Sequence, residues 1–192
     1  MPVAVPLSSP PDQVTSTSLV RFINYFGHQT MVIYDAMLSD KRIIFAGSRN
    51  LSITQIQNYL FAAASMVSPP LYGIHNKILP YVPLVAMTSL EGDEGFMAGV
   101  TNPMFLENRR CYDVSVQIDE GKLNADSSYK REPYFELDMD FIKTLLVRIR
   151  AEKINDDEIR QAFQSYTQLM LDMANNLVYT NSPDSAGMTH RG

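Results

Sequence analysis

The side chains able to support acid–base, metal or nucleophilic chemistry are few in this sequence and far apart. The histidines have no cysteine or carboxylate at the spacing of a metal site, so we interpret them as surface or capping residues. They are His28, His75 and His190. Asp93 and Glu94 could act as an acid pair, although a solvated turn explains them better, and the single cysteine, Cys111, is better interpreted as a small buried side chain than as a reactive thiol. We therefore expect no catalytic residues, no metal and no cofactor.

The sequence also lacks the short motifs that frame nucleophilic hydrolysis and nucleotide binding, G-x-S-x-G and G-x-x-x-x-G-K-[ST]. Its net charge is −5 and its basic residues gather only in pairs, which argues against a nucleic-acid partner. A single cysteine indicates a reducing compartment. No apolar run reaches the roughly 18 to 20 residues of a membrane span, and the proline-broken start does not resemble a signal peptide. We expect a cytoplasmic protein without a transmembrane segment.

Two predicted strands and the loop between them lie at the centre of the chain. Residues 95–99 form a short apolar run bounded by glycines, which we interpret as bends or points of close packing. Residues 112–118 alternate apolar and polar side chains, the pattern of a half-buried strand, and the turn at residues 119–121 ends it. The loop at residues 101–103 must leave the sheet, because Pro103 lacks the N–H that a strand ladder needs.

The segments upstream of these strands are predicted to cover them. Ser52 and Gln55 form a capping box, which opens a helix that is apolar nearly all round and therefore buried. Helices are predicted over residues 19–26, 29–39, 52–66 and 82–90, and short strands over residues 42–46 and 78–80. This alternation predicts an α/β fold, a small mixed β-sheet flanked by helices.

Two further helices are predicted downstream. Asp138 is placed to cap the first, and Asn155 with Glu158 to cap the second. The second carries an apolar stripe at four-and-three spacing, for which packing onto the domain is favoured over a coiled-coil seam. The stripe consists of Ile159, Phe163, Tyr166, Met170, Met173 and Leu177. The predicted organisation is a flexible segment at 1–17, an α/β domain at 18–124, a loop at 125–137, a helical portion at 138–179 and a disordered tail at 180–192.

Two loops are more apolar than plain connections need to be. One contains Pro70, Leu71, Tyr72 and Ile74, and the other contains Met104 and Leu106. Loops of this kind either pack under a neighbouring element or present a surface to a partner, and the sequence leaves both readings open.

Five segments in a fixed order resemble a known family. They are VIYDAMLSDKRIIFAG, an alanine-rich helix, NKILPYVPL, GFMAGVTNPMF and YDVSVQIDEGKL, within residues 19–123. This order is similar to the central part of a DENN module, and closest to the fungal-type branch linked to polarity-axis stabilisation and Arf interaction. The residues of the motif are Gly95, Phe96, Gly99, Val100, Thr101, Asn102, Pro103, Phe105, Asp113, Asp119 and Gly121. The helices after residue 138 resemble the downstream DENN portion more loosely.

The resemblance implies a guanine-nucleotide exchange factor, or part of one, that binds a small GTPase of the Rab or Arf class in vesicle trafficking or cell polarity. Such a factor needs no bond chemistry, because it binds the GTPase switch segments in a conformation that favours GDP release. The alternative is a scaffold of the same fold that binds the GTPase without exchange. An unrelated enzyme is the third possibility, supported only by Cys111 and the Asp93–Glu94 pair.

The family layout includes an upstream longin-like lobe, and residues 1–18 are too few to form it. This lobe would then belong to a longer form of the chain, be lost, or come from another chain. Any association with vesicle or plasma membranes is expected to be peripheral and through partners.

Overall fold

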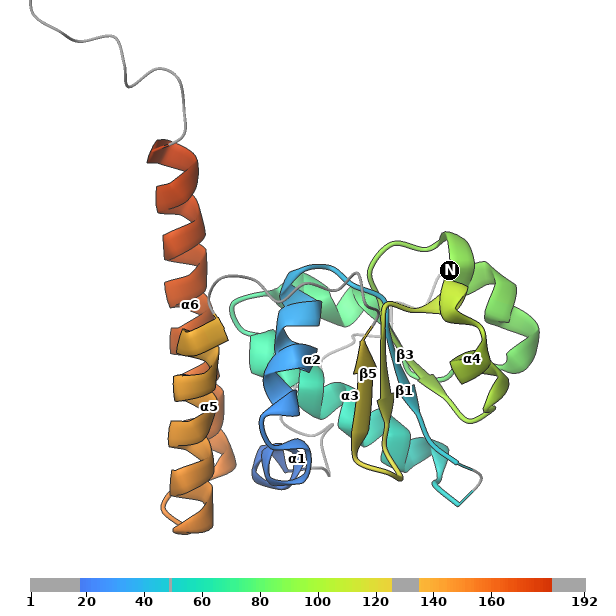
Figure 1. The fold of residues 1–192 in the computed structure, drawn as a ribbon, viewed down its shortest axis with the longest axis horizontal. Coiled ribbons are helices and arrows are strands. Elements are labelled where there is room, and N and C mark those ends of the chain that lie inside the picture. Colours follow the sequence, from blue (N-terminus) through green and yellow to red (C-terminus); the bar gives the residue numbers. More distant parts are fainter. Residues whose placement is uncertain (1–17, 49, 126–134, 181–192) are drawn as a thin grey trace, which may run out of the picture.

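The computed structural model describes residues 18–48, 50–125 and 135–180. The expectations for residues 1–17, 126–134 and 181–192 lie outside these ranges. The described chain has a five-stranded mixed sheet with helices on both faces, which confirms the α/β fold class (Figure 1). In chain order the elements are α1 (Leu19–Phe26), α2 (Gln29–Leu38), β1 (Ile43–Ala46), α3 (Ile53–Val67), η2 (Tyr72–Lys77), β2 (Ile78–Leu79), η3 (Leu84–Gly92), β3 (Met97–Val100), α4 (Met104–Glu107), η4 (Arg109–Cys111), β4 (Val114–Gln117), β5 (Lys122–Ala125), α5 (Phe135–Arg150) and α6 (Asp156–Thr180), where η marks a 3-10 helix.

The strands follow the order β2-β3-β1-β4-β5. β1 is the central strand, and it pairs in parallel with β3 on one side and with β4 on the other. Ile43 is aligned with Met97 of β3 and with Val114 of β4. The predicted strands at 42–46, 95–99 and 112–118 therefore lie side by side, as expected, and the predicted strand at 78–80 is β2, which pairs with β3.

β5 is an element that the sequence interpretation missed. Residues from Asn124 onward were expected to be loop, but Lys122–Ala125 pairs antiparallel with β4. The predicted turn after β4 becomes the hairpin connection, and Gly121 adopts the positive φ of 60° that glycine allows at such a position. Only Leu123 and Ala125 contact the core from β5, so its alternation is too short to stand out in the sequence.

The helix ends follow the predicted chemistry. At the start of α3 the Gln55 backbone N–H donates to Ser52 Oγ at 3.2 Å, and the Ser52 N–H donates to Gln55 Oε1 at 2.9 Å, which is the predicted capping box. Gly27 ends α1 with φ of 55°. Asp138 was expected to cap a helix, but α5 begins at Phe135, so Asp138 lies one turn inside it.

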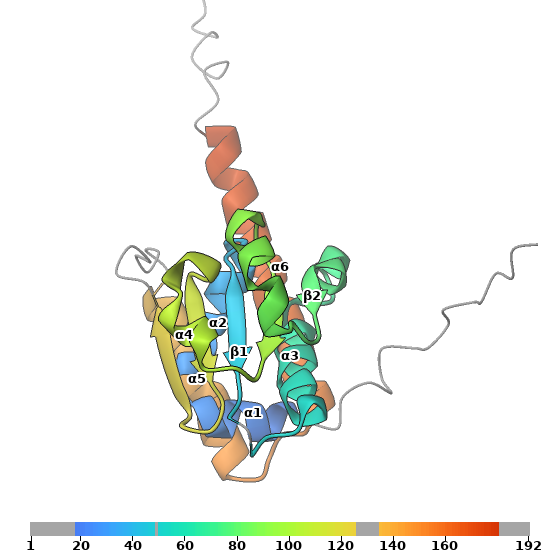
Figure 2. The same cartoon turned by 90° about the vertical axis from the view of Figure 1, so that its right-hand side faces the viewer.

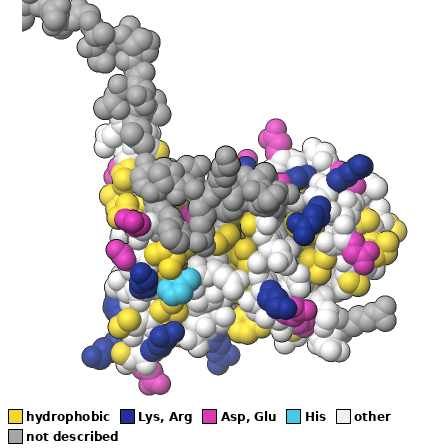
Figure 3. All heavy atoms as spheres, viewed as in Figure 1, with side chains coloured by type: hydrophobic (Ala, Val, Ile, Leu, Met, Phe, Trp, Pro, Cys, Tyr) yellow, Lys and Arg dark blue, Asp and Glu magenta, His cyan; other side chains and the backbone are white. Residues whose placement is uncertain are grey.

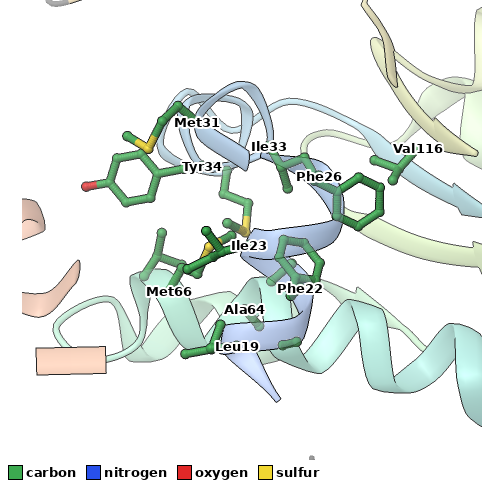
Figure 4. Close-up of a cluster of buried hydrophobic side chains, with 14 of the residues drawn as sticks. Leu19, Phe22, Ile23, Phe26, Met31, Ile33, Tyr34, Ala64, Met66 and Val116 are labelled. Atoms are coloured by element: carbon green, nitrogen blue, oxygen red, sulfur yellow. The ribbon is translucent and has the colours of Figure 1, made fainter. Parts of the chain in front are cut away.

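Most of the core lies between the sheet and the layer formed by α1, α2 and α3. Figure 4 shows side chains of α1, including Phe22 and Phe26, in one cluster with Met66 of α3 and Val116 of β4. These side chains are almost completely buried. The apolar face of α1 explains this position, since all four of its apolar positions at helical spacing face inward.

The opposite face of the sheet is also covered. The elements η3, α4 and η4 lie on this face (Figure 2). Their residues pack on the other side chains of the central strands, and Phe105 is fully buried. This layer corrects the half-buried interpretation of residues 112–118, because Ser115 is only 1% exposed although it faces away from the main core. Its hydroxyl has no hydrogen-bond partner among the residues that the structure describes.

α5 and α6 form a further layer on the far side of α1, α2 and α3 (Figure 1). Tyr34 of α2 bonds to Thr167 of α6 at 2.9 Å, and because Thr167 Oγ1 donates to a helix carbonyl, the Tyr34 hydroxyl is the donor. The Tyr166 hydroxyl donates to the buried Asp138 carboxylate at 2.6 Å. Burial, together with this carboxylate, raises the pKa of Tyr166 far above its usual range. The Tyr34–Thr167 bond thus joins this layer to the domain, and the Tyr166–Asp138 bond joins α6 to α5 within the layer.

α6 packs on the domain only along its first half. Ile159, Phe163 and Tyr166 are buried, which confirms the packing interpretation, whereas Met170 and Met173 are half-buried. Beyond them the helix extends past the rest of the molecule (Figure 1). Within the described residues, no helix has the length and hydropathy required to cross a bilayer.

Candidate functional site

The motif residues after β3 lie at the edge where the parallel strands end. The Asn102 side chain accepts from the Met104 N–H at 3.0 Å, which turns the chain into α4 as Pro103 ends the ladder. Phe105, one turn further, is fully buried and anchors this turn on the sheet. The Thr101–Pro103 connection therefore leaves the sheet as predicted and is held in place on both sides.

Strands β1 and β3 are neighbours, but the segments that follow them cross to opposite faces of the sheet. β1 leads to α3, which packs in the main core, and β3 leads to α4, which packs on the other face. The carboxyl ends of parallel strands at such a switch point are the usual place for a binding crevice in open α/β sheets.

A hollow of about 250 Å³ lies at this position. Its walls come from the ends of three strands: Gly47 and Ser48 after β1, residues 101–103 after β3, and Asp119 and Glu120 after β4. A second, more open hollow lies against the same 101–103 loop and is bounded by Leu51 and Met104. The loop is thus a ridge with a hollow on either side.

Asp119 joins two walls of the first hollow. Its carboxylate accepts from the Ser48 N–H at 2.5 Å and from the Ser48 hydroxyl at 3.0 Å. This pair holds the segment after β1 next to the end of β4, since hydrogen bonds to a charged acceptor are stronger than neutral ones. Asp119 therefore has a positioning role within the motif.

Asp113 has the corresponding role at the other end of β4. It forms a two-pronged ion pair with Arg42, with Nη2–Oδ1 at 2.8 Å and Nε–Oδ2 at 3.2 Å, and it also accepts from the Arg42 backbone N–H at 2.9 Å. Partial burial raises the pKa of Asp113, but the hydrogen bonds and charge of Arg42 outweigh it and hold that pKa below its usual value. The two aspartates of the motif thus fix both ends of β4 against β1.

The motif glycines are points of close approach, as predicted for Gly95 and Gly99. A Cβ on Gly95 would collide with the backbone of Asp40, and a Cβ on Gly99 would come within 2.6 Å of the Pro80 carbonyl oxygen. Gly121 lies against the ring of Tyr25, whose hydroxyl donates to the Ile118 carbonyl at 2.7 Å. Phe96 and Val100 are buried in the second core. These motif residues build the frame of the site.

Each of the two loops considered as partner-facing, at residues 70–74 and 104–106, has some side chains packed on the core and one exposed. In the first, Leu71 and Ile74 are half-buried against the main core, Pro70 is half-buried, and Tyr72 is 72% exposed. In the second, Leu106 packs against the second core while Met104 is 48% exposed. Because they pack on opposite faces of the sheet, the two loops do not form one surface.

Exposed apolar side chains on η3 were not predicted as a surface. Tyr81, Leu84 and Val85 are exposed, and Val85 is the most exposed of them at 91%. Val82 and Leu90 hold this segment onto the second core, and η3 contacts α4. We call the side formed by Tyr81, Leu84, Val85 and Met104 the η3/α4 face. Residues 82–90 are predicted as a helix, and the structure has the 3-10 helix η3 there; the apolar run at residues 81–85 is the sequence signal for this surface.

The groups considered for chemistry lie apart. Cys111 is fully buried, its Sγ donates to the Met87 carbonyl at 3.5 Å, and burial raises the pKa of the thiol, so it is the small core residue that the sequence favoured. Asp93 and Glu94 are exposed in the turn before β3. His75 bonds to Ser68 at the surface. In the described ranges, no three metal-binding side chains gather at one point.

Charges on the surface are mixed. On the face seen in Figure 3, lysine and arginine side chains are dispersed and acidic side chains lie among them. A dispersed pattern does not provide the basic stripe that phosphate backbones require.

Comparisons with known proteins give a consistent result. A family model described as "Stabilization of polarity axis" (SPA) matches residues 16–127, more than half of the chain. The chain is 28% identical over 109 residues to DENN domain-containing protein 11 of Rattus norvegicus and, equally, of Mus musculus, a match covering 55% of this chain and 24% of the relative. It is 27% identical over 100 residues to AFI1-like protein C776.06c of Schizosaccharomyces pombe, covering 50% of this chain and 16% of that protein. The matches thus span a sixth to a quarter of these curated relatives.

Proposed function

This chain belongs to the stabilization of polarity axis family, and from that premise we propose that it is a DENN-like module that docks a small GTPase of the Rab or Arf class in cell polarity or vesicle trafficking. The proposal draws on the similarity to a DENN domain-containing protein over 109 residues, 55% of this chain. It also draws on the order of segments, which is similar to the central DENN portion throughout residues 19–123.

The observation that carries the proposal is the η3/α4 face. Large apolar side chains are exposed there on short elements that Val82, Leu90 and Phe105 hold onto the second core. Rigidly held, exposed apolar side chains are what a protein–protein interface needs at its centre, since ordering costs little on binding. Exchange would follow from a higher affinity of this face for the nucleotide-free GTPase than for the GDP form.

Binding of the 192-residue chain to a panel of Rab and Arf GTPases tests the proposal, together with release of a fluorescent GDP analogue. We expect at least one GTPase to bind, and Val85→Asp to weaken that binding about tenfold or more, because a charge would be buried in an apolar contact. Val147→Asp is the matched control: Val147 is 65% exposed on α5, away from this face.

The release measurement separates exchange from recruitment. Faster GDP release, by this chain or by a longer form carrying an upstream lobe, is the result expected of an exchange factor. Binding with unchanged release identifies a scaffold that recruits a GTPase without exchange. If no member of the panel binds either form, the proposed function is wrong.

A further inference from the structure

We propose that the hollow at the carboxyl ends of β1, β3 and β4 is a docking pocket for a basic side chain, best an arginine, on a protein partner. The inference rests on one part of the proposed function, namely that the module acts by binding another protein. It concerns a different surface from the η3/α4 face, which is defined by its exposed apolar residues.

The size of the hollow suits one side chain. Its volume of about 250 Å³ lies below the roughly 300 to 1,000 Å³ of small-molecule and cofactor sites. Residues 101–103, which line it, also line the second hollow.

The side chains that line the hollow include both apolar and acidic ones. Ala46, Pro103 and Leu106 provide an apolar wall, and Asp119 and Glu120 provide carboxylates, without any cationic side chain in the lining. Lysine and arginine combine an aliphatic stem with a charged end, so one such side chain would contact both parts. An anionic ligand, such as a phosphate, would instead face two like charges.

Arginine fits this arrangement better than lysine or a metal ion. Thr101 and Gln117 add neutral acceptors to the lining, and a guanidinium has five donors in a planar fork to satisfy several acceptors together. Both oxygens of Asp119 already accept from Ser48, which fixes the carboxylate in place and leaves it fewer free lone pairs for a metal ion. Glu120 forms an ion pair with the exposed Lys122 at 2.7 Å, an interaction that a partner's guanidinium could replace.

The test is an NMR titration of the ¹⁵N-labelled 192-residue chain with N-acetyl-arginine N-methylamide at low ionic strength. The matched neutral probe is the citrulline analogue, which has nearly the same shape without the charge. We expect saturable shifts at the amides of Ser48, Thr101, Asn102 and Asp119 with a Kd in the millimolar range, and no saturable shifts with citrulline.

Variants locate the interaction. Glu120→Gln is expected to weaken arginine binding about two- to fivefold, and Asp119→Asn together with Glu120→Gln to abolish saturation. Circular dichroism and Tm check that both variants are folded. If Asp119→Asn disturbs the Ser48 contact, the single variant Glu120→Gln is the test of arginine binding. Glu94→Gln removes the same charge at the opposite edge of the sheet and is expected to change nothing.

Equal shifts with arginine and citrulline would overturn the proposal, as would shifts spread over the surface or a Glu120→Gln variant that binds as tightly as the parent. These outcomes are separate from those of the GTPase panel. A positive titration stands even if no GTPase binds, and a bound GTPase does not rescue a failed titration.

Discussion

Arg42 and Asp113 show how single residues of the motif serve the fold. Their ion pair joins the residue directly before β1 to the residue directly before β4. These two strands are separated by more than sixty residues in the chain. Each side chain is between a fifth and a third exposed, so solvent reduces the strength of the pair. The backbone N–H of Arg42 adds a bond that a surface ion pair lacks.

Asp113→Asn is expected to cost about 1 kcal/mol at pH 7, because the variant loses the charge and one of the acceptor oxygens. The pKa of Asp113 is lowered in the folded state, so its stabilising effect is present above the unfolded value near 3.9 and is lost as the pH falls through the folded value. Urea denaturation at pH 7 and at successively lower pH should show the parent and variant converging below about pH 4. A constant difference across that range would contradict the role of the charge.

Elements of the sheet depend on burial from both sides. β4 lies between β1 and β5, with the main core on one face and the η3, α4 and η4 layer on the other. Val116 is aligned with Phe45 and Leu123 and is fully buried.

Val116→Asp should lower the free energy of unfolding by about 3 kcal/mol or more, because it places an unpaired carboxylate in the main core. Asn124→Asp adds the same charge at an exposed position of the adjacent β5 and should change the free energy by less than about 0.5 kcal/mol. Urea denaturation measures both. Parent-like stability of Val116→Asp would show that β4 is not the strand described here.

Polar bonds hold α6 both to α5 and to the start of α1. Besides the Tyr166–Asp138 bond, Asp156 at the start of α6 accepts from the Ser18 hydroxyl at 2.7 Å and from the Val20 N–H at 2.9 Å. The Tyr166 ring also stacks on Phe141, with centroids 4.2 Å apart.

Tyr166→Phe keeps this stacking and removes only the hydroxyl, so its cost reports the bond to Asp138. We expect a loss of about 1 to 3 kcal/mol, because a buried carboxylate loses a donor. Tyr72→Phe, at an exposed position, is the control and should be neutral. Thermal unfolding of the parent and the two variants measures the difference. Equal Tm values for all three would mean that the Tyr166–Asp138 bond does not stabilise the contact between α5 and α6.

The sequence predicted these elements where their signals are local. The capping box of Ser52 and Gln55 and the glycine after α1 are read within one turn of helix, and both are present in the structure. β5 was missed because four residues with two inward side chains give no clear period. The burial of Ser115 was missed because it depends on a layer formed by residues 84–111, which no pattern within β4 reveals.

The hollow could not be predicted from the sequence for a related reason. Asn102 and Asp119 belonged to the recognised motif, but Ser48, which bonds to Asp119, had no local signal. The three segments meet only because β1 lies between β3 and β4, and strand order is a property of the whole fold. The motif therefore predicted the family and the residues that hold the strands together. The hollow itself depends on the strand order, which the motif does not reveal.

At the scale of the whole molecule, the domain has two unequal sides. One carries α5 and α6 behind the α1–α3 layer, and the other carries η3 and α4 (Figure 1). Exposed apolar side chains lie on η3 and α4. The family match covers residues 16–127 and so ends before α5. We therefore propose that a protein partner binds on the η3 and α4 side, and that the helical side supports the domain.

Hydrogen-exchange mass spectrometry of the 192-residue chain, alone and with a Rab or Arf GTPase in its GDP form, tests this claim most directly. The account predicts slower exchange of backbone amides within residues 84–107 in the complex and unchanged exchange within α5. Protection confined to α5 and α6, or no protection with any GTPase of the panel, would contradict it.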